Sequence, residues 1–274
     1  MSNSSQGPSR PSPEGIPAAT IIIFRDGRAG GKGDSTGGSA PEILMTVRSR
    51  SMAFAGGMAV FPGGRVDPED FDLAKSLGDK NGLTLDEAAH QIAAIRETLE
   101  ETGLALGFKG AITAQSAHEA RALLDKTKAL APVLGAFGWA LDFDQIVPFA
   151  RWFPMNEKLS RVYDTRFYLA NLGTGAVEVS VDNSENTKLF WTTAQGALDA
   201  AQTGEIKLIF PTRRNLERLA LFSSFADART QAEAIPVKTI IPQVDESSGK
   251  PMLTIMEDAG YPITAELLET VARG

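Results

Sequence analysis

The chain has 274 residues, 43% of them hydrophobic, so it can bury a sizeable core in one domain with short additions. Its formal net charge of −7 argues against a protein that coats nucleic acid or binds membranes through a polybasic surface. The absence of cysteine excludes disulfides and thiolate zinc sites, and two histidines are too few for a multi-histidine metal centre.

The first residues are rich in Ser, Pro and Gly, and we expect a disordered tail, 1–16, before a main domain, 17–230. This start lacks the apolar region of a signal peptide, and no stretch approaches 18 apolar residues. We therefore expect a soluble, cytoplasmic protein without membrane or nucleic-acid partners. Residues 18–24 and 42–48 form β-branched or apolar runs, which predict two strands joined by a glycine-rich connection.

A short strand, 59–61, is expected before a tight turn at Phe61-Pro62-Gly63-Gly64. The next segment, 67–82, is charged and weakly periodic, so we expect a loop there, within an insertion at about 67–86. From Leu85 the apolar residues recur at helical spacing. Thr84 predicts the N-cap of this helix and Gly103 predicts its end.

The second half of the chain mixes helical and strand patterns. We expect helices at 116–130, 134–146, 193–203 and 212–225, and strands at 166–171, 177–181 and 188–191. The last part, 231–274, is predicted to be a C-terminal extension containing a hairpin. Strands and helices in separate segments indicate an α+β fold.

Three carboxylates, Glu97, Glu100 and Glu101, occur at positions i, i+3 and i+4 of the predicted helix. This spacing places them on one helix face, where like charges repel and favour a bound cation. Oxygen clusters of this kind are typical of Mg²⁺ ligands. The alternative interpretation is a solvated acidic helix face without a ligand.

The sequence Arg96-Glu97-Thr98-Leu99-Glu100-Glu101-Thr102-Gly103-Leu104 resembles the second half of the Nudix hydrolase signature, with Thr98 where an aliphatic residue is usual. The first half departs from the pattern: Gly64 and Arg96 are 32 positions apart instead of fourteen, which indicates an insertion of eighteen residues. The signature's first Glu has no clear counterpart, and Asp70 or Glu87 is expected to pair with Arg96 instead. The resemblance implies an α/β/α sandwich around a mixed sheet.

The resemblance also implies roles for these residues. Glu97, Glu100, Glu101 and the Gly63 carbonyl would bind Mg²⁺ or Mn²⁺, with Glu97 the first choice for the general base. Arg96 would orient the catalytic carboxylates. The family often adds a carboxylate six residues before a Trp-led strand, which here is Glu185, and the alternatives are Asp182 and Glu178.

A second resemblance concerns the substrate. The pattern Leu44-Met45-Thr46-Val47-Arg48-Ser49, followed by Gly57 and by Phe61 to Gly64, is similar to the motif of coenzyme A-directed Nudix enzymes. Its usually basic inner positions are Met52, Ala53, Phe54 and Ala55 here, so an incidental Arg on a strand is the alternative. The long insertion resembles the branch that contains peroxisomal coenzyme A diphosphatases. The substrate-binding candidates are Arg48, Gly64, Arg151 and Arg166, since guanidinium binds phosphate bidentately.

These resemblances lead to the hypothesis of a metal-dependent diphosphatase. Its expected small-molecule partner is a nucleoside diphosphate, coenzyme A or acyl-coenzyme A, cleaved to 4′-phosphopantetheine and adenosine 3′,5′-bisphosphate. One alternative is a pyrophosphatase for nucleotide sugars, NADH or ADP-ribose. Another is a Nudix module that binds a nucleotide without cleaving it. The sequence leaves the oligomeric state open, and a homodimer is one option.

Overall fold

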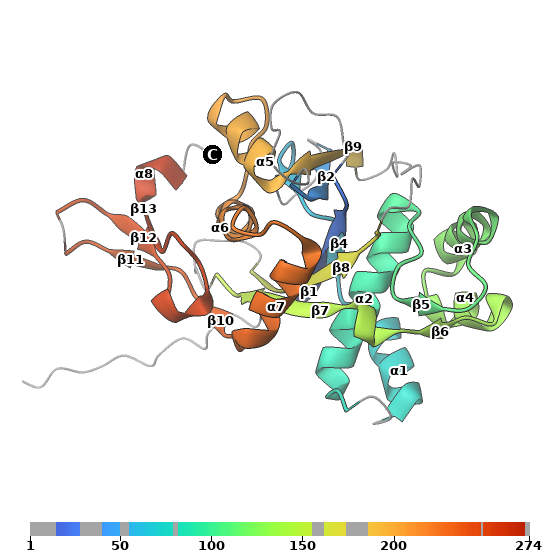
Figure 1. Ribbon diagram of the computed structural model, residues 1–274. Coiled ribbons are helices and arrows are strands. Elements are labelled where there is room, and N and C mark those ends of the chain that lie inside the picture. The colour runs from blue at the N-terminus through green and yellow to red at the C-terminus, as the bar shows by residue number, and fades with distance from the viewer. Residues whose placement is uncertain are drawn as a thin grey trace, which may run out of the picture.

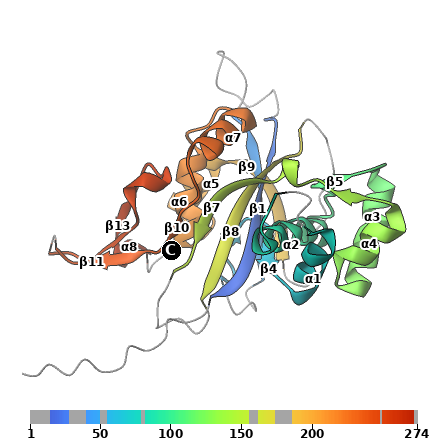
Figure 2. The same ribbon diagram turned by 90° about the horizontal axis from the view of Figure 1, so that it is seen from below.

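A mixed β-sheet forms the centre of the fold, and helices cover both of its faces (Figure 1, Figure 2). The computed structural model describes residues 15–27, 40–49, 55–78, 82–154, 162–173, 186–247 and 249–271. Within these residues eight strands join the large sheet, in the order β10-β7-β8-β1-β2-β3, with β4 paired to β1 and β9 paired to β2. Their bounds are β1 Ile16–Arg25, β2 Glu42–Arg48, β3 Ala59–Val60, β4 Gly63–Arg65, β7 Val147–Trp152, β8 Tyr163–Asn171, β9 Asn186–Thr193 and β10 Thr239–Ile240.

The central strand β1 explains the two-sided core. It pairs in parallel with β8 and antiparallel with β2 and β4. Its side chains alternate between the faces: Ile21 and Ile23 pack with one set of helices, and Ile22 and Phe24 with the other. All four are almost inaccessible to solvent, which accounts for the uninterrupted apolar run in the sequence.

On one face of the sheet, helix α2 Leu85–Thr102 packs against β1, β4 and β8. Helices α1 Pro68–Leu77 and α3 Ala114–Thr127 pack against α2, and α4 Leu130–Phe137 packs against α3 and α1. The other face is covered by α5 Ala194–Gln202, α6 Phe210–Leu219 and α7 Phe225–Ala234 (Figure 2). This arrangement confirms the α+β class and the three-layer sandwich. None of the helices in the described segments is long and apolar enough to cross a membrane.

Smaller elements complete the chain. Near α3 and α4 lie β5 Phe108–Lys109, β6 Ala140–Leu141 and the 3₁₀ turn η2 Phe143–Gln145. The C-terminal part holds β11 Gln243–Asp245, β12 Met252–Thr254, η3 Glu257–Ala259, β13 Ala265–Leu267 and α8 Leu268–Val271. β11 and β12 form the expected hairpin, which β13 extends to a three-stranded sheet. Figure 1 shows this sheet at the end of the molecule opposite α1, α3 and α4. The preceding β10 joins the large sheet beside β7.

Three sequence predictions for these elements are wrong. The segment expected to be a loop contains helix α1, whose start is fixed by a capping box between Asp67 and Asp70 and by a Pro in its first turn. The helix expected at 134–146 ends at Phe137, because Gly138 takes a left-handed conformation before β6. The helix expected at 212–225 is two helices, α6 and α7. The strand expected at 177–181 lies outside the described residues.

Candidate active site

The C-terminal half of α2 brings the predicted carboxylates together against the β4 turn. Thr84 caps the helix start by accepting a hydrogen bond from the Glu87 amide, and Gly103 ends the helix with a left-handed φ of 76°. Along one face, Ala89, Ile92 and other apolar residues are fully buried against the sheet. The last two turns therefore lie in a fixed position beside β4, which pairs with β1.

The two glycines of β4 make close contact with this helix. The Gly63 amide donates a 2.9 Å hydrogen bond to Glu101 Oε2. A side chain at Gly64 would place its Cβ 2.3 Å from Glu97 Oε1, so only glycine leaves room for this carboxylate. Gly63 itself has a φ of +153° and would clash with the Ala19 carbonyl if it carried a Cβ. The turn thus forms a cradle for Glu97 and Glu101.

Arg96 ties the helix to α1 and β4 from a buried position, with 3% of its side chain exposed. Its Nε and Nη2 donate to Asp70 Oδ1 and Oδ2, each at 3.0 Å, and Nη2 also donates to the Arg65 carbonyl at 2.9 Å. Its Nη1 donates to Glu97 Oε1 at 2.8 Å. Of the two expected partners, Asp70 is therefore the one that pairs with Arg96, and it is almost completely buried.

The charges at this site are not balanced by Arg96 alone. Burial raises the pKa of Glu97 to about 8 against the opposing effect of Arg96, and the Glu101 and Glu100 carboxylates raise it further. Glu100 accepts from Lys128 Nζ at 2.9 Å, and Arg121 Nε donates to the Glu100 backbone carbonyl at 2.9 Å. Lys128 and Arg121, both from the α3 region, have no signature in the motif, and sequence reasoning missed them.

The donor set suits a hard cation. Three carboxylates at one helix end and a glycine cradle with no room for a Cβ provide oxygen ligands and close backbone approach. In the described part of the chain, no three acidic, His or Cys side chains converge as a preformed metal group. Glu97 and Glu100 are instead held by Arg96 and Lys128, and Glu101 by the Gly63 amide.

The other predicted residues lie in different surroundings. Arg151 forms a two-bond pair with Asp164, at 2.8 and 2.5 Å. Arg166 binds Glu87 at 2.5 Å and also pairs with Asp86. Since Glu87 is ten residues before Glu97 on α2, this pair lies about 15 Å along the helix from the carboxylate site. The structure therefore does not bring these two arginines to the cluster, and Glu185 lies outside the described residues.

Arg48 does not belong to the carboxylate cluster but to a pocket that shares Gly63 with it. It lines a mainly apolar pocket together with Gly63, Phe61, Trp152 and Phe167. Its Nε is buried and has no hydrogen-bond partner among the described residues. A buried, unpaired guanidinium nitrogen is costly unless a ligand completes it, so Arg48 is available for an anion at this pocket.

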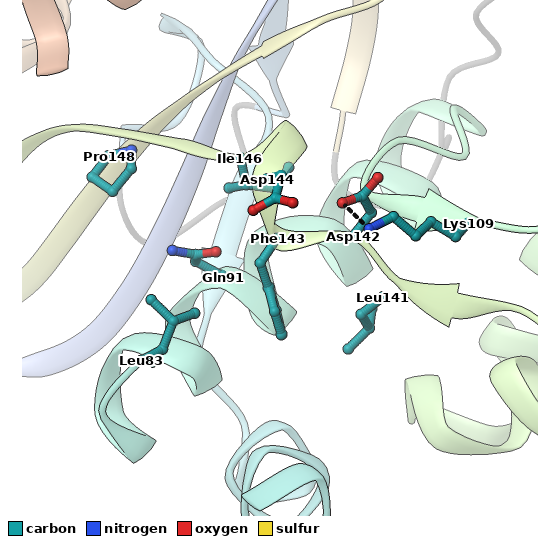
Figure 3. Close-up of a pocket in the computed structure, with 9 residues that line it drawn as sticks. All are labelled: Leu83, Gln91, Lys109, Leu141, Asp142, Phe143, Asp144, Ile146 and Pro148. Atoms are coloured by element: carbon teal, nitrogen blue, oxygen red, sulfur yellow. Dashed lines mark ion pairs between the residues drawn. The ribbon is translucent and has the colours of Figure 1, made fainter. Parts of the chain in front are cut away.

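A separate polar pocket lies beside the first half of α2 (Figure 3). Its lining includes Gln91, Phe143 and Asp144, and an ion pair of 2.9 Å joins Lys109 Nζ to Asp142 Oδ1. It contains none of the residues predicted from the motifs. The carboxylate cluster and the apolar pocket, which share the glycine turn, are therefore the candidate active site.

Replacing Gly64 with alanine tests the cradle. The added methyl group would push Glu97 from its place, and a displacement of about 1 Å at a catalytic group lowers activity by about a hundredfold. The kinetics of diphosphate hydrolysis measure the loss of activity, and urea unfolding measures any change in stability that accompanies it. Gly135→Ala on α4, whose Cβ would meet nothing within 4 Å, is the matched control and should keep full activity. A Gly64→Ala variant as active as this control would contradict the role of Gly64 in positioning Glu97.

Comparison with known proteins gives two informative relatives. No family model matches the chain. The chain is 27% identical over 261 residues to the acyl-coenzyme A diphosphatase NUDT19 of Gallus gallus, with 76% of this chain and 69% of that protein covered. It also matches the crystal structure of a NUDIX hydrolase from Alicyclobacillus acidocaldarius, with a TM-score of 0.64 and 26% identity, over 79% of this chain and 96% of that one. Both similarities extend over most of the chain.

Proposed function

We propose that the chain is a Nudix hydrolase acting on a pyrophosphate bond, and that its substrate is coenzyme A or acyl-coenzyme A. The products would be 4′-phosphopantetheine and adenosine 3′,5′-bisphosphate, and the cofactor Mg²⁺ or Mn²⁺. One observation supports this substrate above others: Arg48 of the coenzyme A-type motif lines a pocket together with Gly63, whose amide contacts Glu101. The similarity to an acyl-coenzyme A diphosphatase agrees with this choice.

The reaction requires water to attack a diphosphate and a group to accept the proton. Glu97 lies in the cradle beside Gly64 and is held there by Arg96, so its carboxylate is oriented to take that proton. Glu97, Glu100, Glu101 and the Gly63 carbonyl would hold the divalent ion. When bound, this ion neutralises the charge of the diphosphate and activates the attacking water. Arg96 and Asp70 fix the helix and the turn relative to each other.

Arg48 would bind a phosphate group of the substrate. Guanidinium groups donate two parallel hydrogen bonds to phosphate oxygens, and such charge-assisted bonds are stronger than neutral ones. The buried Nε of Arg48 lacks a partner among the described residues, so bound phosphate would satisfy it. In a protein with a net charge of −7, this local positive charge helps to hold an acidic substrate.

The direct test is to incubate the purified protein with coenzyme A and Mg²⁺ and to identify the products by mass spectrometry. Hydrolysis to 4′-phosphopantetheine and adenosine 3′,5′-bisphosphate supports the proposal. The same panel should include acetyl-coenzyme A, NADH, ADP-ribose and a nucleotide sugar. Faster cleavage of one of the last three would reject coenzyme A as the substrate. Binding without cleavage of any compound would indicate a nucleotide-binding module.

Replacing Arg48 with glutamine should weaken substrate binding. Loss of a charged hydrogen-bond donor costs about 1.5–3 kcal/mol, so we expect KM for coenzyme A to rise at least about tenfold, with a smaller change in kcat. Arg229→Gln, at an exposed position of α7, is the control and should leave KM unchanged. An Arg48→Gln variant with the KM of this control would remove Arg48 from the substrate site.

A further inference from the structure

The apolar pocket beside Arg48 is lined in part by aromatic side chains. Phe61, Trp152, Tyr163 and Phe167 contribute to its lining, and Thr165 and Thr212 add hydroxyl groups. Trp152 and Phe167 belong to the core cluster on the face of the sheet that α5, α6 and α7 cover. The carboxylates lie on the α2 side of the same glycine turn. A substrate crossing this turn can therefore reach both regions at once.

The Trp152 wall of this pocket is held in place by the C-terminal part of the chain. The indole Nε1 donates a 2.9 Å hydrogen bond to the Tyr261 hydroxyl, which donates in turn to Asn215 Oδ1 at 2.7 Å. The two rings meet edge to face, with centroids 5.6 Å apart. Strand β10 also pairs with β7, so that Ile240 lies opposite Trp152. The bond between Trp152 and Tyr261 joins residues 109 positions apart in the chain.

We propose that this pocket receives the flat base of the substrate's nucleoside, and that Tyr261 is a positioning residue that holds the Trp152 wall against it. The inference rests on the proposed function, because it takes the diphosphate to lie at Glu97. Gly63 belongs to both regions, so the group that enters the pocket must lie close to the diphosphate, as the base does, with only the ribose between them. The acyl end of an acyl-coenzyme A is at the far end of its pantetheine arm and does not meet this condition.

The chemistry of the lining favours a base over the pantetheine arm. Aromatic side chains stack on the flat face of any base, and each stacked base contributes about 1–3 kcal/mol. Hydroxyl groups such as those of Thr165 and Thr212 can both donate and accept hydrogen bonds, as the ring nitrogens and amino group of adenine require. Arg48, which also lines the pocket, is in place for a phosphate on the same nucleoside.

A binding experiment tests the occupant without needing turnover. Calorimetry would compare AMP with ribose 5-phosphate, which lacks only the base, and with 4′-phosphopantetheine. We expect AMP to bind at least about tenfold more tightly than ribose 5-phosphate. AMP should also change the tryptophan fluorescence of Trp191→Phe protein but not of Trp152→Phe protein. Equal affinities for AMP and ribose 5-phosphate, or displacement of AMP by 4′-phosphopantetheine, would overturn the proposal.

A conservative variant tests the positioning role. Tyr261→Phe keeps the ring and removes the hydroxyl, so AMP affinity should fall by about fivefold and KM should rise to match, with kcat within about twofold of wild type. Ribose 5-phosphate binding should not change. The control is Thr254→Val, which removes a hydroxyl from the same C-terminal segment, away from Trp152. Unchanged AMP affinity in Tyr261→Phe, or an equal loss for ribose 5-phosphate, would reject the positioning role.

The outcomes separate this inference from the proposed substrate. Suppose that AMP binds as expected, that coenzyme A is not hydrolysed, and that another diphosphate containing adenosine is hydrolysed. The pocket assignment then stands and the proposed substrate is wrong. If coenzyme A is hydrolysed and Trp152 does not respond to AMP, the substrate stands and the pocket assignment is wrong.

Discussion

Replacing Glu97 with glutamine is expected to lower kcat by about 10²–10⁴-fold, the usual contribution of a general base. Glutamine has the shape of glutamate, so it fits the cradle beside Gly64, but it can neither take a proton nor supply a charged ligand. KM should change much less, because Glu97 does not line the pocket that holds Arg48. Steady-state kinetics with coenzyme A, or with whichever diphosphate is cleaved fastest, measures both parameters.

The same variant should not lose stability. Burial raises the pKa of Glu97, which means that the folded protein disfavours its ionised form, and a neutral side chain removes that cost. The free energy of unfolding in urea should therefore be equal to or higher than that of the wild type, as is typical where function opposes stability. Glu119→Gln, an exposed position on α3, is the matched control for both measurements. Activity of Glu97→Gln within tenfold of this control would exclude Glu97 as the base.

The parts of the site that could be predicted from sequence are those with local signals. Thr84, Gly103 and the apolar stripe between them define α2 within a single stretch of chain. The spacing of Glu97, Glu100 and Glu101 then follows from helix geometry alone. Asp70 is one of two expected partners of Arg96 because it lies six residues after Gly64, where the Nudix signature has its first Glu. The start of α1 also has a local signal, Asp67 as N-cap followed by a Pro. The charged, weakly periodic composition of the insertion nevertheless led to the prediction of a loop there.

The parts that could not be predicted depend on distant pairs. Arg166 is a reasonable phosphate ligand when the sequence is considered alone. Only the fold shows that it forms an ion pair with Glu87, which is 79 residues away in sequence. Lys128 reaches Glu100 from the end of α3, across 28 residues. Neither contact is accompanied by a periodic or compositional pattern in the sequence. Long-range polar partners are therefore what this sequence could not reveal, although it was sufficient to predict the fold class.

Replacing Asp70 with alanine should lower the free energy of unfolding by about 3 kcal/mol, because it leaves the buried guanidinium of Arg96 without its main partner. Arg96 keeps its bonds to Glu97 and to the Arg65 carbonyl, which places the cost at the lower end of the range for broken buried pairs. Asp72→Ala, an exposed position on the same helix, is the control and should cost no more than about 0.5 kcal/mol. A double-mutant cycle with Arg96→Ala separates the ion pair from the capping role of Asp70, since the cap is lost in both Asp70 variants. A coupling energy near zero would show that Asp70 acts only as the cap, and that the stretched signature positions its carboxylates without this pair.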